Sequence, residues 1–153
     1  MRGQRRRRRI AMTPAEVDAF LAAEITCRVA TTGVDGRPHV APLWFVWHDG
    51  VLWLNSTVHS QRWTDLSRDP RIAVVVDAGE RYEQLRGVEL AGTATPVGPV
   101  PRPDTGPVDE VATPELLFAR KYAGVDTFTP DGRHAWLRVV PDKIMSWDFR
   151  KIP

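Results

Sequence analysis

The sequence predicts a mainly β domain of the α+β class, folded as a closed or nearly closed antiparallel barrel with a few short helices. Six or seven apolar segments follow one another at hairpin spacing. Asp-Gly turns at 35–36 and 49–50 join the first three segments and require them to pair antiparallel. Helical patterns are few and short, so the crossover helices of a parallel α/β sheet are missing. A length of 153 residues, 42% of them hydrophobic, fits one domain with a sizeable core.

The first half of the chain is predicted to hold one helix followed by a three-stranded meander. Thr13-Pro14-Ala15-Glu16 has the pattern of a capping box with proline at the first helical position. A helix is therefore expected from about Pro14 to Ala23. Apolar and aromatic runs between the Asp-Gly turns then favour β structure. The predicted strands are Ile25–Thr31, His39–Trp47 and Val51–Ser56.

The second half begins with a short helix over Ser60–Arg68, where a serine start, two apolar residues three apart and an Asp-Pro stop coincide. Five prolines between Pro96 and Pro107 predict a loop, because proline cannot join a β ladder. A further helix is expected over Thr113–Tyr122. The remaining strands are predicted at Ile72–Asp77, Val88–Val97, Ala135–Val140 and Ile144–Phe149.

Residues 1–11 differ in composition from the rest of the chain. Arg2 and Arg5–Arg9 supply six positive charges, whereas residues 11–153 hold 15 basic and 19 acidic residues and carry a net charge of about −4. We expect a disordered basic arm over 1–11, or an over-long start, and one folded domain over 12–153. Arginine runs can bind nucleic-acid phosphates, but only the arm supports such binding, so nucleic acid is not an expected partner.

Cysteine content and hydropathy bear on the compartment. Cys27 is the single cysteine, so no intramolecular disulfide can form, as is typical of a reducing compartment. No apolar run reaches the length of a transmembrane helix. We therefore expect a cytoplasmic protein without membrane association. A metal site is not expected, because the four histidines lie in separate segments without ligand spacing.

The segment from Asn55 to Leu66 is the candidate ligand site. It places a strand end, a hydroxyl-rich turn and a helix start in succession, and a helix start presents unpaired amides to anions. Arg62 in the first helical turn has the wrong charge for the helix dipole unless an anion lies opposite. A phosphate would resolve that conflict, with Ser60 as the cap and Ser56 or Thr57 as further donors. The alternative is an exposed Arg62 whose stem packs on Trp63.

Several segments also carry a family resemblance. They are Asp35-Gly36-Arg37-Pro38, Ser60-Gln61-Arg62 followed by Leu66, Arg86–Ala94, and Pro141-Asp142-Lys143-Ile144 with Trp147. In these segments the chain resembles the pyridoxamine 5′-phosphate oxidase-like superfamily of flavin and deazaflavin oxidoreductases. The resemblance covers nearly all of the chain beyond the arm. It implies an antiparallel split β-barrel that works as a homodimer.

The resemblance also implies a cofactor. The oxidases proper have a serine followed by two basic residues in the phosphate-binding stretch, whereas here only Arg62 keeps the charge. The chain is more similar to the branch that binds coenzyme F420, in which one basic residue precedes an Asn/Asp-Leu pair, here Asp65-Leu66. Coenzyme F420 is thus the implied cofactor, with FMN as the alternative. The implied cofactor-binding residues are Pro42, Leu43, Trp44, Asn55, Ser56, Thr57, Ser60, Gln61 and Arg62.

The function implied by this resemblance is hydride transfer from reduced F420 to an unsaturated or oxidised small molecule. The alternatives are an FMN-dependent oxidoreductase and a non-enzymatic flavin carrier or sensor, because a fold supplies a site without proving turnover. No catalytic side chain is predicted, since hydride chemistry resides in the cofactor. The outer wall of the pocket is expected from the loops 79–85 and 96–107 and from a partner subunit. Strand alternation alone offers another interpretation, in which four aromatic residues belong to the barrel core, namely Trp44, Phe45, Trp47 and Trp53; the resemblance places Trp44 at the cofactor instead.

Overall fold

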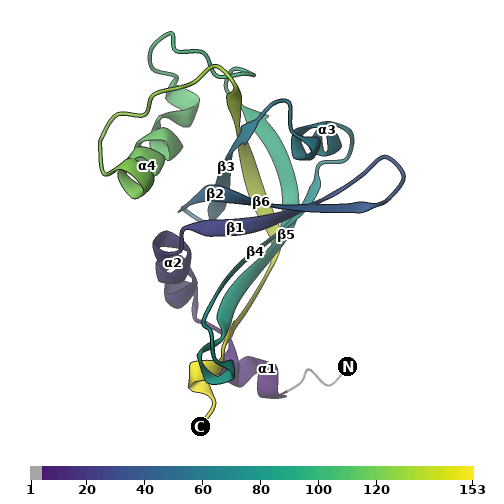
Figure 1. The fold of residues 1–153 in the computed structure, drawn as a ribbon. Helices are drawn as coiled ribbons and strands as arrows, with labels where there is room; N and C mark the ends of the chain where they lie inside the picture. The colour runs from purple at the N-terminus through teal and green to yellow at the C-terminus, as the bar shows by residue number, and fades with distance from the viewer. Residues whose placement is uncertain (1–4) are drawn as a thin grey trace.

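The computed structural model describes residues 5–153 and contains a single barrel with helices at its ends and on its outside (Figure 1). Its strands are β1 (Thr26–Thr32), β2 (Pro38–His48), β3 (Val51–Thr57), β4 (Arg71–Ala78), β5 (Arg86–Val97) and β6 (His134–Asp148). Its helices are α1 (Arg5–Ile10), α2 (Pro14–Ala23), α3 (Gln61–Arg68) and α4 (Ala112–Ala123), with short 3-10 turns η1 (Tyr82–Gln84), η2 (Asp109–Val111) and η3 (Phe149–Lys151).

The six strands close into an antiparallel barrel in the order β1-β2-β3-β6-β5-β4. The predicted meander is confirmed, because β1 pairs with β2 and β2 with β3 around the two Asp-Gly turns. Alternate side chains point inward and form one core, which includes Phe45, Leu54 and Leu90. The mainly β barrel predicted from the sequence is therefore confirmed.

The closing strand is longer than predicted. The sequence suggested two strands separated around Pro141, but β6 runs without interruption for 15 residues. The prediction was wrong because proline was interpreted as a strand break. Pro141 instead lies where the β5–β6 register shifts, opposite Gly92, and a bulge can accommodate a residue without an N–H donor. A side chain at Gly92 would clash with the Val140 carbonyl oxygen, so glycine allows this close approach.

The helix α2 begins and ends where the sequence predicted. Thr13 Oγ1 accepts a hydrogen bond from the Glu16 amide, and the Glu16 carboxylate accepts one from the Thr13 amide. Together they complete the capping box. The helix buries Val17, Phe20 and Leu21 in the same core as the strands.

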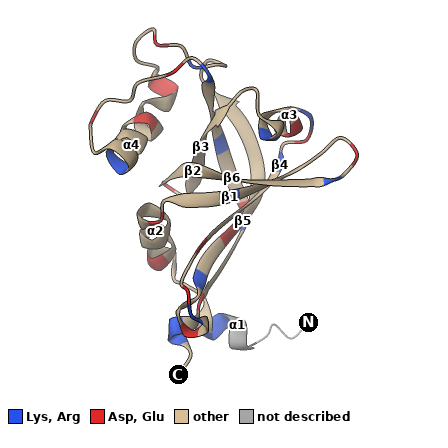
Figure 2. Cartoon of the chain, viewed as in Figure 1, with Lys and Arg blue, Asp and Glu red and all other residues tan. Residues whose placement is uncertain are grey.

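Part of the predicted basic arm forms a short helix. Residues 1–4 lie outside the described part of the chain, whereas Arg5–Ile10 form α1. The segment after α1 is tied to the barrel, because the Met12 amide donates to Ser146 Oγ and Lys151 Nζ donates to the Ala11 carbonyl. Figure 2 shows basic residues in both α1 and the C-terminal turn η3, which lie side by side. Within residues 5–153, no helix combines the length and apolar character needed to span a bilayer.

Candidate functional site

Within the closed barrel, β2 and β3 are hydrogen-bonded over only part of their length, so the wall is open between the first half of β2 and the end of β3. The β2–β3 ladder runs from His48–Val51 to Phe45–Leu54 and stops there, although both strands continue. Beyond that point β2 pairs with β1, and β3 pairs with β6. Two strand edges therefore diverge, and Trp44 lies on one lip of the opening with Asn55 on the other.

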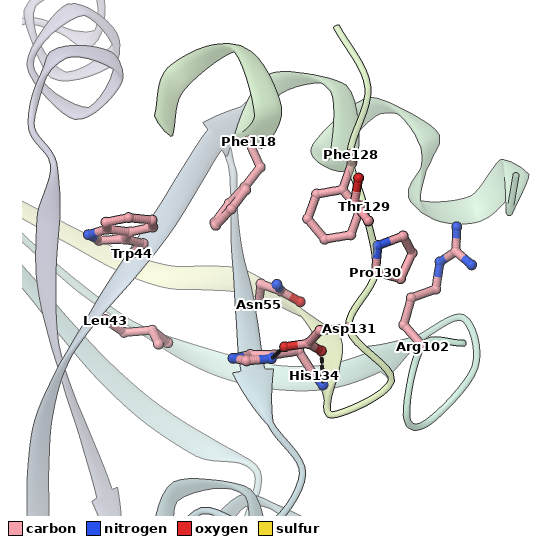
Figure 3. A pocket seen from close by; sticks show the side chains of 10 residues that line it. All are labelled: Leu43, Trp44, Asn55, Arg102, Phe118, Phe128, Thr129, Pro130, Asp131 and His134. Atoms are coloured by element: carbon pink, nitrogen blue, oxygen red, sulfur yellow. Dashed lines mark hydrogen bonds and ion pairs between the residues drawn. The ribbon is translucent and has the colours of Figure 1, made fainter. Parts of the chain in front are cut away.

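A pocket of about 440 Å³ fills this opening, and α4 and the segment that follows it form its outer wall (Figure 3). This volume lies within the range of small-molecule sites. Of the two loops that the sequence analysis placed in the outer wall, 79–85 does not line this pocket. The loop 96–107 contributes only Arg102. The pocket is lined by Leu43, Trp44, Asn55, Arg102, Phe118, Phe128, Thr129, Pro130, Asp131 and His134.

The wall of the pocket is aromatic. The Trp44 ring stacks on Tyr122 with centroids 4.3 Å apart and an interplanar angle of 7°. Phe118 meets the buried Trp136 edge-on at 5.7 Å, and Phe128 packs on both of these rings. Trp44 is 48% exposed, so the expectation that it belongs to the core was wrong, while Phe45 is fully buried. An exposed indole on a rigid strand offers a flat surface to a ring-shaped ligand.

Two side chains of α4 hold the β2 lip in place. The Phe45 amide donates to the Tyr122 hydroxyl at 3.0 Å, and that hydroxyl lies 2.7 Å from the Ile25 carbonyl oxygen. Burial raises the pKa of Tyr122 to about 12, so it stays a neutral hydroxyl. Lys121 Nζ lies over the Phe45 ring and donates to the Leu21 carbonyl, and burial lowers its pKa to about 8. The lip is therefore fixed from outside the barrel.

The floor of the pocket is polar. The Asn55 Oδ1 atom is buried and has no hydrogen-bond partner among the described residues. Beside it, His134 Nδ1 lies 2.7 Å from Asp131 Oδ2 (Figure 3). Asp131 Oδ1 also accepts the amides of Arg133 and His134, which fixes the turn into β6. A buried carbonyl acceptor without a donor is costly and typically marks a place for a ligand or water.

A buried ion pair supports the rim of the pocket. Arg102 is 5% exposed, and its guanidinium donates to both Glu115 carboxylate oxygens at 3.0 Å. Trp136 Nε1 donates to the same carboxylate, and the Arg102 amide donates to the His134 carbonyl. The pair thereby joins the proline-rich loop to α4 and β6.

The start of α3 lies beside the same strand end. Ser60 Oγ caps the helix by accepting the Trp63 amide. Arg62 is 6% exposed, and its Nε donates to Ser56 Oγ at 3.1 Å, so the alternative of an exposed side chain is wrong. No described carboxylate forms an ion pair with Arg62, and burial lowers its pKa. Asp65, on the same helix, instead accepts from Thr31 Oγ1 at 2.8 Å and from Gln61 Nε2.

A family model described as pyridoxamine 5′-phosphate oxidase matches residues 13–148. The chain belongs to this family. Like the family resemblance in the sequence, the match covers both the opened strand pair and α3. No curated protein matches the sequence.

Solved structures agree with the assignment to the pyridoxamine 5′-phosphate oxidase family. A conserved hypothetical protein from Mycobacterium tuberculosis is 29% identical with a TM-score of 0.78, over 94% of this chain and 89% of that one. A putative 5-nitroimidazole antibiotic resistance protein from Bacteroides thetaiotaomicron is 17% identical with a TM-score of 0.72, over 90% and 85%.

A protein described as an F420 reductase is 22% identical with a TM-score of 0.65, over 86% of this chain and 98% of that one. At 17% and 22% identity, the Bacteroides protein and the F420 reductase show only that this chain shares their fold. Other structures with this fold include an FAD-binding protein and a heme-binding protein, so the fold does not determine the cofactor.

The structure of this family member divides the predicted site residues into two groups. Leu43, Trp44 and Asn55 line the pocket. The other predicted residues are not among its lining residues, namely Pro42, Ser56, Thr57, Ser60, Gln61 and Arg62. The sequence analysis missed His134, Asp131 and Phe118. The Asp-x-x-His spacing could have pointed to the pair of Asp131 and His134. No local pattern could have placed Phe118 beside them, because the long connection from β5 to β6 brings these residues together.

Proposed function

We propose that this protein is an oxidoreductase that holds the ring of a deazaflavin, coenzyme F420, in the pocket between β2 and β3. The reduced cofactor supplies the hydride for an unsaturated or oxidised small molecule. FMN is the alternative cofactor, because both rings present the same C=O, N–H, C=O edge. The observation that carries the proposal is the buried Asn55 Oδ1 at the opened strand edge, which has no hydrogen-bond partner within the described chain.

The residues of the pocket fit such a ring. An asparagine side chain offers one acceptor and one donor side by side, which complements a ring N–H flanked by a carbonyl. Trp44 and Phe118 supply apolar surface for the faces of the ring. In this arrangement Asn55 orients the ring, while the aromatic wall excludes water.

Arg62 supports the proposal from the other face of β3. A buried guanidinium without a carboxylate partner keeps its charge and leaves it uncompensated. Phosphate groups, which both F420 and FMN carry, are anions that guanidinium binds well. Ser56 already contacts Arg62, and Asn55 precedes it on the same strand, so one short segment would serve both the ring and the phosphate.

The direct test is the absorbance spectrum of the purified protein, followed by titration with FMN and with F420. A flavin gives two bands near roughly 370 and 450 nm, whereas a deazaflavin gives one band near about 420 nm. We expect F420 to bind more tightly. Tighter binding of FMN would select the alternative cofactor. A heme Soret band with no affinity for either ring would contradict the proposal.

The variant Asn55→Leu tests the observation that carries the proposal. Removing the unpartnered carbonyl should raise the free energy of unfolding of the cofactor-free protein by about 1 kcal/mol. The loss of two hydrogen bonds should weaken cofactor binding by roughly 10- to 100-fold. Denaturant titration and fluorescence titration measure the two effects. Thr95→Leu, on an exposed position of β5, is the control. Unchanged affinity in Asn55→Leu would refute the role of Asn55.

We also propose that the protein works as a homodimer. The outward positions of β2 carry an exposed apolar row, Val40, Pro42 and Trp44. Rows of this kind are typical of surfaces that another protein covers. One chain has a mass of 17.2 kDa, and light scattering at micromolar concentration should give twice that mass. A monomer would refute the proposal.

A further inference from the structure

The pair formed by His134 and Asp131 is a polar feature of the pocket that the proposed function does not use. His134 begins β6, and its ring lies on the pocket floor next to Asn55 (Figure 3). The His134 side chain is 31% exposed, so the ring is accessible from the pocket without being free in solvent. An imidazole held by a carboxylate has one defined orientation, which is how proteins prepare a histidine for binding or proton exchange.

The contact with Asp131 determines what the other ring nitrogen can do. Asp131 is an acceptor when ionised, so His134 Nδ1 carries the hydrogen of the 2.7 Å contact. Burial acts to raise the pKa of Asp131, but hydrogen bonds from the Arg133 amide and the His134 ring outweigh burial and the net pKa is lowered. The carboxylate is therefore ionised at neutral pH. In a neutral ring, Nε2 is then an acceptor only, and it becomes a donor when the ring takes up a second proton.

Other charged groups near His134 either have a partner of opposite charge or belong to the same turn. Arg133 Nε lies 3.8 Å from Asp131 Oδ2, and the Arg102 guanidinium is paired with the Glu115 carboxylate. His59 follows Val58, whose amide donates to the Arg133 carbonyl, and the His59 side chain is exposed. Among the described residues, none forms a hydrogen bond with His134 Nε2. Nε2 is thus the polar atom of the pair that remains for a ligand.

We propose that His134 binds an oxygen atom of the pocket ligand through a protonated Nε2, so that the protein takes up a proton as the ligand binds. The ligand gives the oxygen acceptor, the solvent gives the proton, and Asp131 stabilises the resulting imidazolium. His134 is then a residue that selects for a ligand with an electron-rich oxygen next to the N–H group that Asn55 accepts. This inference rests on the proposed function, because the ligand is the cofactor ring.

The experiment measures proton uptake rather than activity. Titration calorimetry of F420 and of FMN is performed at pH 8 in two buffers with different ionisation enthalpies, which gives the number of protons exchanged on binding. His134→Asn is the test variant, because an asparagine amide can replace Nδ1–H toward Asp131 but has no counterpart of Nε2. His48→Asn, at the exposed end of β2, is the matched control. Nitrogen-15 spectra of the histidine rings report the same event directly.

We expect the wild type and His48→Asn to take up close to one proton on binding, and the affinity for the cofactor to fall by up to about tenfold per pH unit as the pH is raised. His134→Asn should lose both effects and should keep its thermal stability. The Nε2 resonance of His134 should shift to that of a protonated nitrogen on binding. Binding without proton uptake, or the same uptake in His134→Asn, would overturn the inference while the proposed function stands. If neither cofactor binds the wild type, the proposed function fails and this inference fails with it.

Discussion

Two buried arginines in this barrel have opposite surroundings. Arg102 is 5% exposed and donates to both oxygens of Glu115 and to two backbone carbonyls. Arg62 is 6% exposed and donates to one serine hydroxyl, with no carboxylate paired to it in the described chain. The two side chains are equally buried, so burial alone does not distinguish their roles.

This difference separates an arginine that stabilises the fold from one whose charge is left for a ligand to compensate. The charge of Arg102 is compensated by Glu115, and this pair joins a loop, a helix and a strand. A guanidinium with one neutral partner carries an uncompensated charge, which a bound anion would neutralise. We therefore assign Arg102 to folding and propose Arg62 for binding. Three variants test this assignment.

The largest effect on the free energy of unfolding is expected from Arg102→Met. This change leaves the buried Glu115 carboxylate without its cation, and breaking a buried pair in this way costs about 3–5 kcal/mol. Urea denaturation should show the loss. In the double variant Arg102→Met with Glu115→Gln, most of that loss should be recovered, because the remaining buried group is neutral. A loss below about 1 kcal/mol in the single variant would mean that the pair contributes little.

An intermediate effect on the free energy of unfolding is expected from Asp65→Asn, which removes the carboxylate on the helix that carries Arg62. Asp65 is held by Thr31 instead, and that hydrogen bond lowers its pKa below 3.8 despite its burial. A lowered carboxyl pKa contributes stability that is complete above the unfolded-state value of about 3.9 and is lost as pH falls through the folded value.

Asp65→Asn should therefore be less stable than the wild type at pH 7, and its stability should fall less than that of the wild type between about pH 5 and pH 3. Denaturant midpoints across this range measure both. Cofactor affinity should change little. A large change in affinity would indicate that Asp65 compensates Arg62 and that the comparison between the two arginines is wrong.

The smallest effect on folding is expected from Arg62→Met. Removing an uncompensated buried charge should leave the free energy of unfolding of the cofactor-free protein unchanged or raise it by about 1 kcal/mol. The Ser56 hydroxyl keeps a partner, because it also donates to the Thr57 carbonyl. The measurement is the thermal midpoint without cofactor. A fall of several degrees would show that Arg62 is a structural residue like Arg102.

Local patterns predicted most of the fold. The capping box at Thr13 and the two Asp-Gly turns specify their own backbone conformations, so the sequence contained enough information there. The proline-rich loop begins later than predicted, because Pro96 is the partner of Leu137 in the β5–β6 ladder. The uninterrupted β6 was missed because Pro141 is accommodated by a bulge that depends on Gly92, about 50 residues earlier in the chain.

The site was predictable only in part, because some of its residues are brought together by segments that lie far apart in the chain. Trp44 and Asn55 lie on neighbouring strands of a predicted meander, so their proximity followed from local order. His134 reaches the pocket because the chain returns from α4 to the β3 edge, and no short pattern encodes that path. The burial of Arg62 likewise depends on where α3 packs, whereas its sequence context equally allowed an exposed side chain.

The most direct test of the account is the affinity of Arg62→Met for F420 and FMN, compared with the wild type and with Arg138→Met, an exposed arginine on β6. Loss of a charge-assisted hydrogen bond to phosphate, about 1.5–3 kcal/mol, should raise the dissociation constant roughly 10- to 150-fold for whichever cofactor the wild type binds. The control should bind like the wild type, and the midpoint of cofactor-free Arg62→Met should not fall. Equal affinity in Arg62→Met and the wild type would contradict the assignment of Arg62 to the cofactor phosphate.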